Sequence, residues 1–417
     1  MHDSKLCSRL KAQLTKFCAQ LCVDLPKPLA GFVSEMLFGI QSSQDVKLSN
    51  IARSLQEKIA LIRTEKRLSR NLKSPDLEKE LTPQLVRMGS SRVQTNTVLA
   101  LDLSDIRKEY AQKMEYLATI RDGSTGELHS GYWLCDVTAA EVNGSEIVPL
   151  YQKLFSVEAN DFSSENAEIL AAVDLIREQT QGRGIWTIDR GGDRKRLLEP
   201  LLDRAQRFVI RSTGKRTVID RKGLQGSVAE VAGRCRLRHQ ARIVKIQDGQ
   251  EKTYELRYGA VPIRLPGRSE PLWLVVVAGF GDQPLMLLTN LPVRAGDSQS
   301  LWWIVQIYLT RWKIEETFRF MKQSYNLEDI RVMKYQRLKN LVILVTAVAY
   351  FAATFLGQQM KLRILCEKLL IISQRFFGIP PFRFYALADG IRRILSQAVF
   401  SPPETPPASL QLELTLG

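Results

Sequence analysis

The order of apolar runs between residues 96 and 213 constrains the fold of this chain more than any other feature. The run TVLALDLSDI comes first, and MEYLATIRDGSTGELHSGYWLCDVTAA follows as two strands joined by a turn at 122–126. Helical and strand-like segments then alternate as NAEILAAVDLIREQT, GIWTIDRGGD, RKRLLEPLLDRA and RFVIRST. This β-β-β-α-β-α-β order predicts an α/β core with a mixed five-stranded sheet and helices on both faces.

The segments on either side of this core have different patterns. The first 95 residues show helical apolar spacing, and Ser49 or Asn50 is the expected N-cap of the helical stretch that ends in TEKRLSRNL. We therefore predict six parts: a helical N-terminal domain (1–95), the first part of the core (96–213), a β-rich insertion (214–297), a core helix (298–335), a helical C-terminal region (336–400) and a disordered tail (401–417).

The charge of the chain favours an anionic partner. Lys and Arg number 59 against 44 Asp and Glu, a formal charge of +15. Nucleic acid is the leading candidate and an acidic membrane surface the second. Basic residues are densest between Arg207 and Lys245, and a second group lies on the N-terminal helices: Lys58, Arg63, Lys66, Arg67, Arg70 and Lys73. We predict that the N-terminal domain and the insertion bind DNA phosphates, although a merely solvated basic helix is the alternative for the first.

Cysteine usage and hydropathy exclude several other classes. The six cysteines and three histidines are scattered and form no CxxC pair, so a zinc site is not expected. Neither a signal peptide nor an apolar leader is expected at the start, which favours a reduced, cytoplasmic location. The apolar stretch 341–356 has sixteen residues, fewer than the roughly 20 needed to cross a bilayer. It is predicted to be a buried core helix, and no membrane partner is expected.

The stretch YLTRWKIEETFRFMK, residues 308–322, is predicted to be an amphipathic helix with an unusual polar row. On an unbroken helix Tyr308, Arg311, Glu315 and Lys322 lie within about 60° of one another, directly beside the apolar face. A solvated face would spread its charges over the outer half of the helix. A phenol, a guanidinium, a carboxylate and an ammonium in one row indicate a functional site.

Three carboxylates are candidates to meet at such a site. Asp102 ends the apolar run VLALD, Asp189 ends IWTID, and Glu315 lies in the polar row. Carboxylates at strand ends and on a helix packed against the sheet can converge, and their oxygens suit Mg²⁺ or Mn²⁺. Two such ions about 4 Å apart support phosphodiester chemistry. Either aspartate taken alone is more often a turn or cap residue, and Asp105 and Asp193 lie close by, but Asp102 and Asp189 are preferred because they end the strands.

These motifs resemble those of the DDE transposases of bacterial insertion sequences. The similarity is strongest to the insertion-sequence-four type, whose signature is Tyr-x2-Arg-x3-Glu-x6-Lys. Residues 308–322 match all four residues and all three spacings, and DLSDI at Asp102 and IDRGGDR at Asp189 resemble the two aspartate motifs. The resemblance implies an RNase H-like catalytic core that is interrupted by a β-rich insertion before the last catalytic helix.

The resemblance also implies an activity and a set of ligands. Asp102, Asp189 and Glu315 would be catalytic and would bind two Mg²⁺ ions, with Asp102 bridging them and Mn²⁺ able to substitute. Such enzymes bind the terminal inverted repeats of their element and catalyse metal-dependent cleavage and strand transfer, in cut-and-paste transposition. The expected partners are double-stranded DNA, both element ends and target, and a second copy of the chain in a homodimer. A prokaryotic cytoplasm, at the nucleoid when DNA-bound, is the expected location.

Four more residues receive roles from the resemblance. Arg311 and Lys322 would contact DNA phosphates with Tyr308 beside them, and Arg190 would touch a phosphate next to Asp189. Relatives that form DNA hairpins place a Trp on the last insertion strand to stack on a flipped base. Here that strand reads PLMLLTNLPV without an aromatic residue. Trp273 on the preceding strand is the candidate substitute, with a buried core Trp as the alternative.

Two other functions compete with an active transposase. One is a domesticated descendant that binds terminal repeats without cutting them. An intact acidic triad disfavours it, because a pure binder gains nothing from uncompensated carboxylates beside DNA. The other is a different RNase H-like nuclease, which the complete Tyr-Arg-Glu-Lys spacing and the large basic insertion disfavour.

Overall fold

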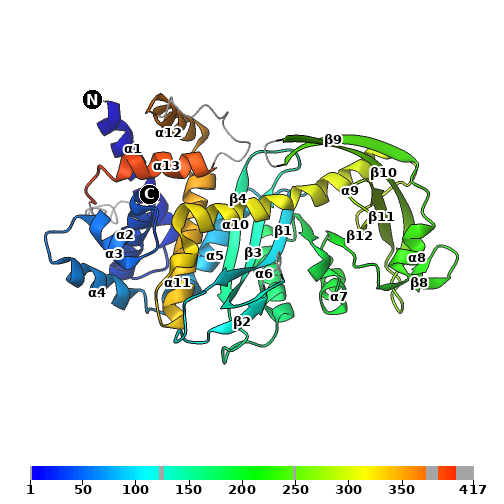
Figure 1. Ribbon diagram of the computed structural model, residues 1–417, viewed down its shortest axis with the longest axis horizontal. Helices are drawn as coiled ribbons and strands as arrows, with labels where there is room; N and C mark the ends of the chain where they lie inside the picture. Colours follow the sequence, from blue (N-terminus) through cyan, green and yellow to red (C-terminus); the bar gives the residue numbers. More distant parts are fainter. Residues whose placement is uncertain (1, 122–125, 248–249, 372–383, 401–417) are drawn as a thin grey trace, which may run out of the picture. The chain divides into compact units, whose positions relative to one another are not determined.

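The chain folds into two compact units, which we call the helical unit and the sheet unit (Figure 1). The computed structural model describes residues 2–121, 126–247, 250–371 and 384–400. The helical unit combines Met1–Gln84 with Met321–Gly417, and the sheet unit is Leu85–Phe320. The first unit is therefore built from both ends of the chain, and the second from its middle.

The helical unit is held together by aromatic and amide side chains in its core. The ring of Phe17 lies 6.0 Å from that of Tyr350 and 5.5 Å from that of Phe351. The buried amide of Asn340 donates to two backbone carbonyls between the fourth and fifth helices, at 2.9 and 2.6 Å. Its elements are α1 (His2–Leu21), α2 (Lys27–Ser43), α3 (Leu48–Leu55), α4 (Leu61–Asn71), α5 (Asp76–Ser90, which runs into the sheet unit), η2 (Leu327–Asp329), α11 (Tyr335–Tyr350), the π-helical η3 (Phe351–Phe355), α12 (Gln358–Ile371) and α13 (Phe384–Leu395).

The basic stretch after α2 forms two helices, and its N-cap differs from the predicted one. Lys47 is the N-cap of α3, so Ser49 and Asn50 lie in the first turn of the helix. Gln56 ends α3 in the left-handed conformation, with φ 52°, and α4 starts five residues later. The break lets each helix turn its own apolar face inwards, because Ile51 on α3 and Leu68 on α4 are both completely buried.

The apolar stretch 341–356 is buried as predicted. Tyr335–Phe355 is long and apolar enough to cross a membrane by length and composition alone. However, 89% of its most apolar window is buried inside the protein. This burial supports the prediction of a core helix. The predicted tail, 401–417, lies outside the described residues.

The sheet unit is built on one large mixed sheet of twelve strands. The strand order is β2-β3-β1-β5-β6-β12-β11-β10-β7-β8, with β4 paired to β3 and β9 to β10. Strand β5 is parallel to both β1 and β6, and all other pairs are antiparallel. The strands are β1 (Val98–Arg107), β2 (Ala118–Arg121), β3 (Leu128–Ala140), β4 (Ile147–Phe155), β5 (Ile185–Ile188), β6 (Phe208–Arg211), β7 (Thr217–Asp220), β8 (Gln225–Ser227), β9 (His239–Gln247), β10 (Gln250–Arg264), β11 (Leu272–Ala278) and β12 (Leu285–Thr289). The helical elements are α6 (Glu165–Thr180), η1 (Arg190–Gly192), α7 (Lys195–Asp203), α8 (Val228–Gly233), α9 (Ser298–Thr310) and α10 (Trp312–Tyr325, which runs into the helical unit).

The sheet is larger than the five strands predicted, for two reasons. Strand β4 was not foreseen, because its residues are buried almost without interruption and so do not alternate in polarity. In addition, β12 pairs with β6, with Leu288 opposite Ile210, so the strands of the insertion extend the core sheet. The predicted turn at 122–126 falls largely on residues that are not described.

Both faces of the central strands are covered. Helix α9 packs with Val98 of β1, Ile185 of β5 and Val209 of β6 in one apolar cluster. Neighbouring strand residues point to opposite faces, and Trp186, which follows Ile185, is also fully buried. The buried first part of β1, residues 98–101, carries no charged side chain, and its first aspartate, Asp102, follows directly.

The predicted helix 308–322 is interrupted at Arg311. Helix α9 ends at Thr310 and α10 starts at Trp312. Around the junction the backbone bonds span three residues instead of four, from Arg311 N to Tyr308 O (3.1 Å) and from Ile314 N to Arg311 O (3.0 Å). The polar row therefore spans two helices, and the angles of a single continuous helix do not apply to it.

Candidate active site where the parallel pairing of β1, β5 and β6 ends

The register of three parallel strands brings two aspartates and an arginine into one row. Leu101 of β1 pairs with Ile188 of β5, and Ile188 pairs with Ile210 of β6. Asp102, Asp189 and Arg211 each follow by one residue. The apolar residues before them fix the strands in the core, so these polar side chains meet where the parallel pairing ends.

Asp189 is held ionised by hydrogen bonds and positive charge. The hydroxyl of Tyr308 donates to its Oδ1 at 2.9 Å, and Nη1 of Arg211 lies 3.5 Å from the same oxygen. Burial of the carboxyl opposes ionisation. The backbone N–H of Arg190, the charge of Arg311 and the Tyr308 hydroxyl outweigh it and lower the pKa of Asp189.

Asp102 has the opposite balance. The backbone N–H of Leu103 donates to it at 3.0 Å, and its nearest cation, Nη1 of Arg311, lies 3.9 Å away. Burial, together with the negative charges of Glu315 and Asp189, raises the pKa of Asp102 to about 6, although Arg311 lowers it in part. Asp102 is thus a carboxyl group whose negative charge the protein compensates poorly.

Arg311 lies among the three carboxylates. Its side chain is only 5% exposed; Nη2 lies 2.7 Å from Oε1 of Glu315, and the guanidinium lies over the ring of Tyr308 at 5.7 Å. Burial lowers the pKa of Arg311, but the Tyr308 phenol and the carboxylates of Asp102, Glu315 and Asp189 raise it by more. All three predicted carboxylates therefore act on this one cation.

Three other predicted site residues are not part of this cluster. Lys322 belongs to the helical unit, where its Nζ pairs with Glu328 at 2.8 Å. Arg190 lies next to Asp189 in η1, with its side chain exposed. Trp273 lies within β11, opposite Thr289 of β12, and packs against the apolar cluster under α9. The side chain of Trp273 is only partly buried there.

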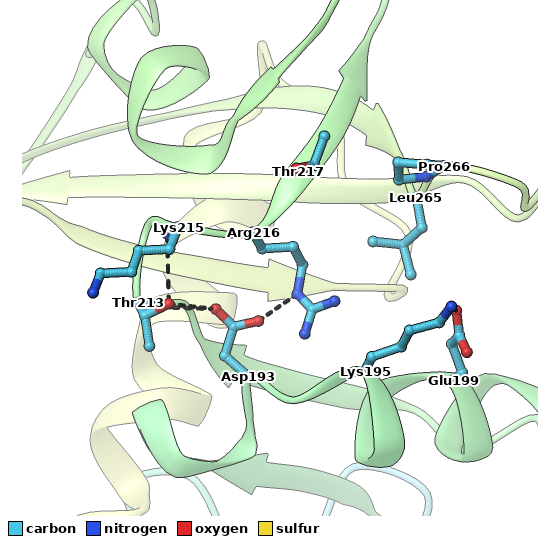
Figure 2. A pocket seen from close by; sticks show the side chains of 9 residues that line it. All are labelled: Asp193, Lys195, Glu199, Thr213, Lys215, Arg216, Thr217, Leu265 and Pro266. Carbon is cyan, nitrogen blue, oxygen red and sulfur yellow. Dashed lines mark hydrogen bonds and ion pairs between the residues drawn. The ribbon is translucent and has the colours of Figure 1, made fainter.

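The two neighbouring aspartates differ clearly from the chosen pair. Asp105 is three residues beyond Asp102 on β1, so its side chain points to the opposite face of the strand. Figure 2 shows Asp193 pointing towards Thr213 and Arg216, at the edge of a pocket. The side chain of Asp193 is fully buried and accepts hydrogen bonds from Ser212 Oγ (2.7 Å), Thr213 N (2.8 Å), Thr213 Oγ1 (3.1 Å) and Arg216 Nε.

Two polar residues beside the site were not anticipated from the sequence. Arg211 contacts Asp189, and the end of the run RFVIR was the signal that could have found it. Asp136 on β3 lies opposite Asp102 and is buried, but it accepts from the amide of Gln152 at 2.6 Å and the hydroxyl of Ser104 at 3.0 Å. The closeness of Arg211 to Asp189, and of Asp136 to Asp102, follows only from the pairing of the strands.

The donor set suits a hard divalent cation, but the present spacing does not. The three side chains offer only carboxylate oxygens, the ligands that Mg²⁺ and Mn²⁺ prefer. Burial, with the repulsion from Glu315 and Asp189, raises the pKa of Asp102, and a bound cation would offset both effects. Among the described residues, no three His, Cys, Asp or Glu side chains are arranged to hold a metal ion. Here Glu315 is bound to Arg311 instead.

Exposed basic side chains extend well beyond the site. In the sheet unit these include Lys215, Arg221, Lys222, Arg234, Arg236, Arg238 and Arg242. In the helical unit Lys58, Arg63, Lys66, Arg70 and Lys73 are exposed, whereas Arg67 pairs with Glu35 at 2.5 Å and Glu57 at 2.7 Å. Most of the predicted basic residues are thus available to a phosphate backbone.

Comparison with known proteins identifies a related family. Residues 95–352 match the family model of the transposase DDE domain. Among curated proteins, no sequence matches this chain significantly. One similar solved structure is a cryo-EM structure of the piggyBac transposase synaptic complex with hairpin DNA, with a TM-score of 0.45 and 10% sequence identity. The similarity covers 95% of this chain and 81% of that one.

Proposed function

Since the chain belongs to the family of the transposase DDE domain, which it matches over residues 95–352, we propose that it is an insertion-sequence transposase. It binds the terminal inverted repeats of its element, cuts the DNA there and joins the freed ends to a target. The observation that carries this proposal is the gathering of Asp102, Asp189 and Glu315 around Arg311, beside the point where the parallel pairing of β1 and β5 ends. The Tyr-Arg-Glu-Lys spacing supports a place in the insertion-sequence-four branch, and the order β4-β3-β1-β5-β6 supports an RNase H-like core.

Enzymes of this family use divalent metal ions, and we assign their ligands here to Asp102, Asp189 and Glu315. Asp102 lies beside Asp189 in the strand register and would hold Mg²⁺ together with it, or Mn²⁺ in place of Mg²⁺. When bound, such ions activate a water or a 3′-hydroxyl and stabilise the leaving oxygen of a phosphodiester.

The side chains around the carboxylates orient them and bind DNA. The Tyr308 hydroxyl and Arg211 fix Asp189 in its ionised form, ready to act as a ligand. Arg311 and the exposed Arg190 supply donors for phosphate oxygens, and Lys322 is assigned a further phosphate contact. Trp273 is assigned base stacking through the part of its ring that the apolar cluster leaves exposed.

The wider basic surfaces suggest how the substrate is held. The exposed Lys and Arg side chains of the insertion and of α4 would bind the DNA backbone without reading its sequence. A transposase must hold two element ends at once, and we propose that a homodimer does so. A DNA-acting enzyme of this kind belongs in the prokaryotic cytoplasm, at the nucleoid when bound to DNA.

The test is cleavage of duplex DNA that carries the inverted repeats flanking the gene of this protein. We expect Mg²⁺-dependent cleavage by the full chain, and a loss of about 10³-fold or more in Asp102→Ala and Glu315→Ala. Asp105→Ala is the matched control, because it removes a carboxylate from the same strand but from its other face. Binding without cleavage in both Mg²⁺ and Mn²⁺ would instead identify a domesticated descendant.

A further inference from the structure

We propose that Arg311 is an internal counter-ion that takes the place of metal in the carboxylate cluster and moves to a DNA phosphate when metal binds. The proposal rests on the proposed function in one respect, that Glu315 is a metal ligand. It adds that the binding of metal and the binding of DNA strengthen each other, which no single contact in the site would provide. Arg311 would thereby be a positioning residue for Glu315 as well as a phosphate contact.

The contacts of Arg311 are those of a cation shared among anions. One nitrogen, Nη2, lies 2.7 Å from Glu315, and the other, Nη1, lies 3.9 Å from Asp102. On its other side the guanidinium lies over the ring of Tyr308, whose hydroxyl donates to Asp189. The positive charge therefore sits between residues that a divalent cation would otherwise neutralise.

The arrangement leaves Arg311 incompletely satisfied. Its Nε is buried and has no hydrogen-bond partner within the described part of the chain, and the 3.9 Å contact to Asp102 is too long for a hydrogen bond. The one short contact is to Glu315, a side chain that is 48% exposed. A buried guanidinium with an unused donor is ready to accept another anion.

The two partners can separate without unfolding a helix. Arg311 lies at the junction between α9 and α10, and Glu315 lies in the first turn of α10. Both side chains are long and flexible, so a change of rotamer is enough to break the contact. The backbone of the site can stay in place while the ion pair opens.

A divalent cation and the guanidinium compete for the same carboxylate. A cation that binds Glu315 must displace Arg311, and the energy of that ion pair weakens cation binding when DNA is absent. The displaced guanidinium keeps its planar pair of donors, which matches the geometry of a phosphate. Metal binding then strengthens DNA binding, and DNA strengthens metal binding by the same factor.

The first measurement is Mn²⁺ affinity of the full chain without DNA, by electron paramagnetic resonance. We expect Arg311→Met to bind Mn²⁺ about tenfold or more tightly than the wild type, because a competing positive charge is gone. Arg319→Met is the matched control: it removes an exposed arginine from the same helix and should change the affinity by less than about twofold. Arg311→Lys keeps the positive charge but loses the planar pair of guanidinium donors, and we expect its Mn²⁺ affinity to rise about threefold. This variant takes the place of Arg311→Met if Arg311→Met does not fold.

The second measurement is binding of end-bearing duplex DNA with Ca²⁺ or with EDTA. We expect Ca²⁺ to tighten binding in the wild type and in Arg319→Met, and to have a several-fold smaller effect in Arg311→Met. Equal Mn²⁺ affinities of Arg311→Met and the wild type, with cleavage intact, would overturn the counter-ion role and leave the proposed function standing. If neither protein bound Mn²⁺ and the wild type did not cleave DNA, both proposals would fall.

Discussion

Asp193 and Asp102 are two carboxylates of the sheet unit that the protein neutralises to very different extents. Asp193 is fully buried, yet its pKa is lowered, because Arg216, Ser212 and a backbone N–H outweigh the burial. The pKa of Asp102 rises to about 6, because burial and the negative charges of Glu315 and Asp189 outweigh the charge of Arg311. Burial opposes the ionisation of both groups, so their hydrogen-bond partners and neighbouring charges make the difference.

The difference separates structural carboxylates from those available to a ligand. The donors around Asp193 connect η1 to the segment between β6 and β7. The negative charge of Asp193 is therefore compensated within the protein. Asp102 has one backbone donor and a distant cation, so much of its charge is left for a partner. Completeness of the hydrogen bonding, more than position after a strand, distinguishes the two.

The largest expected effect is on Asp193. We expect Asp193→Asn to lower the free energy of unfolding of the sheet unit by about 3 kcal/mol at pH 7, because Arg216 loses a buried partner. Urea denaturation followed by tryptophan fluorescence measures this unit, since all six tryptophans lie within it. The folded pKa of Asp193 is lowered, so its contribution is present above the unfolded pKa and is lost as the pH falls through the folded one.

The matched control for that prediction is Asp282→Asn. Asp282 is an exposed residue of the same unit, between β11 and β12, and its substitution should change stability by less than about 0.5 kcal/mol. If Asp193→Asn behaved like Asp282→Asn, the contrast between structural and available carboxylates would be lost.

A smaller effect is expected for Tyr308→Phe. The change removes the hydroxyl that donates to Asp189 at 2.9 Å and leaves the ring in place. We expect a loss of about 1 to 1.5 kcal/mol in the urea experiment at pH 7, since one hydrogen bond to a charged group disappears. The same variant carrying Asp189→Asn should show little further loss from the missing hydroxyl. Full additivity of the two substitutions would contradict a direct contact between them.

The smallest effect has the opposite sign. We expect Asp102→Asn to stabilise the metal-free protein by about 1 kcal/mol at pH 8, a value reduced for the partial exposure of the side chain. The folded pKa of about 6 lies above the ordinary value of 3.8, so the ionised form costs stability above pH 6. The gain should shrink as the pH falls from 6 and vanish below 3.8. Destabilisation by Asp102→Asn at pH 8 in EDTA would reverse the comparison with Asp193.

The apolar runs located the end of β5 at Ile188, but β1 continues past Asp102 to Arg107 because it keeps pairing with β3, so the prediction that Asp102 ends its strand was wrong. VLAL and IWTI are completely buried segments, and the aspartate after each one marks the point where the core ends. Arg211 was missed, although it also follows an apolar run, because its closeness to Asp189 depends on the parallel pairing of β5 and β6. No local pattern contains that information.

The break at Arg311 was invisible for a different reason. Both sides of the junction are strong helical segments, and a change from four-residue to three-residue hydrogen bonds leaves no mark on apolar spacing. The placement of the guanidinium among the carboxylates likewise depends on how α9 packs over β1, β5 and β6. Residue types could be proposed from the sequence, but their partners could not.

The pairing of β12 with β6 has a consequence for dissecting the protein. In a fragment that ends after β6, at residue 213, the outer backbone of β6 would lose its partner strand. Unpaired N–H and C=O groups along an apolar strand are a template for pairing with another molecule. Such a fragment would self-associate through β6, so the insertion protects the solubility of the domain that it interrupts.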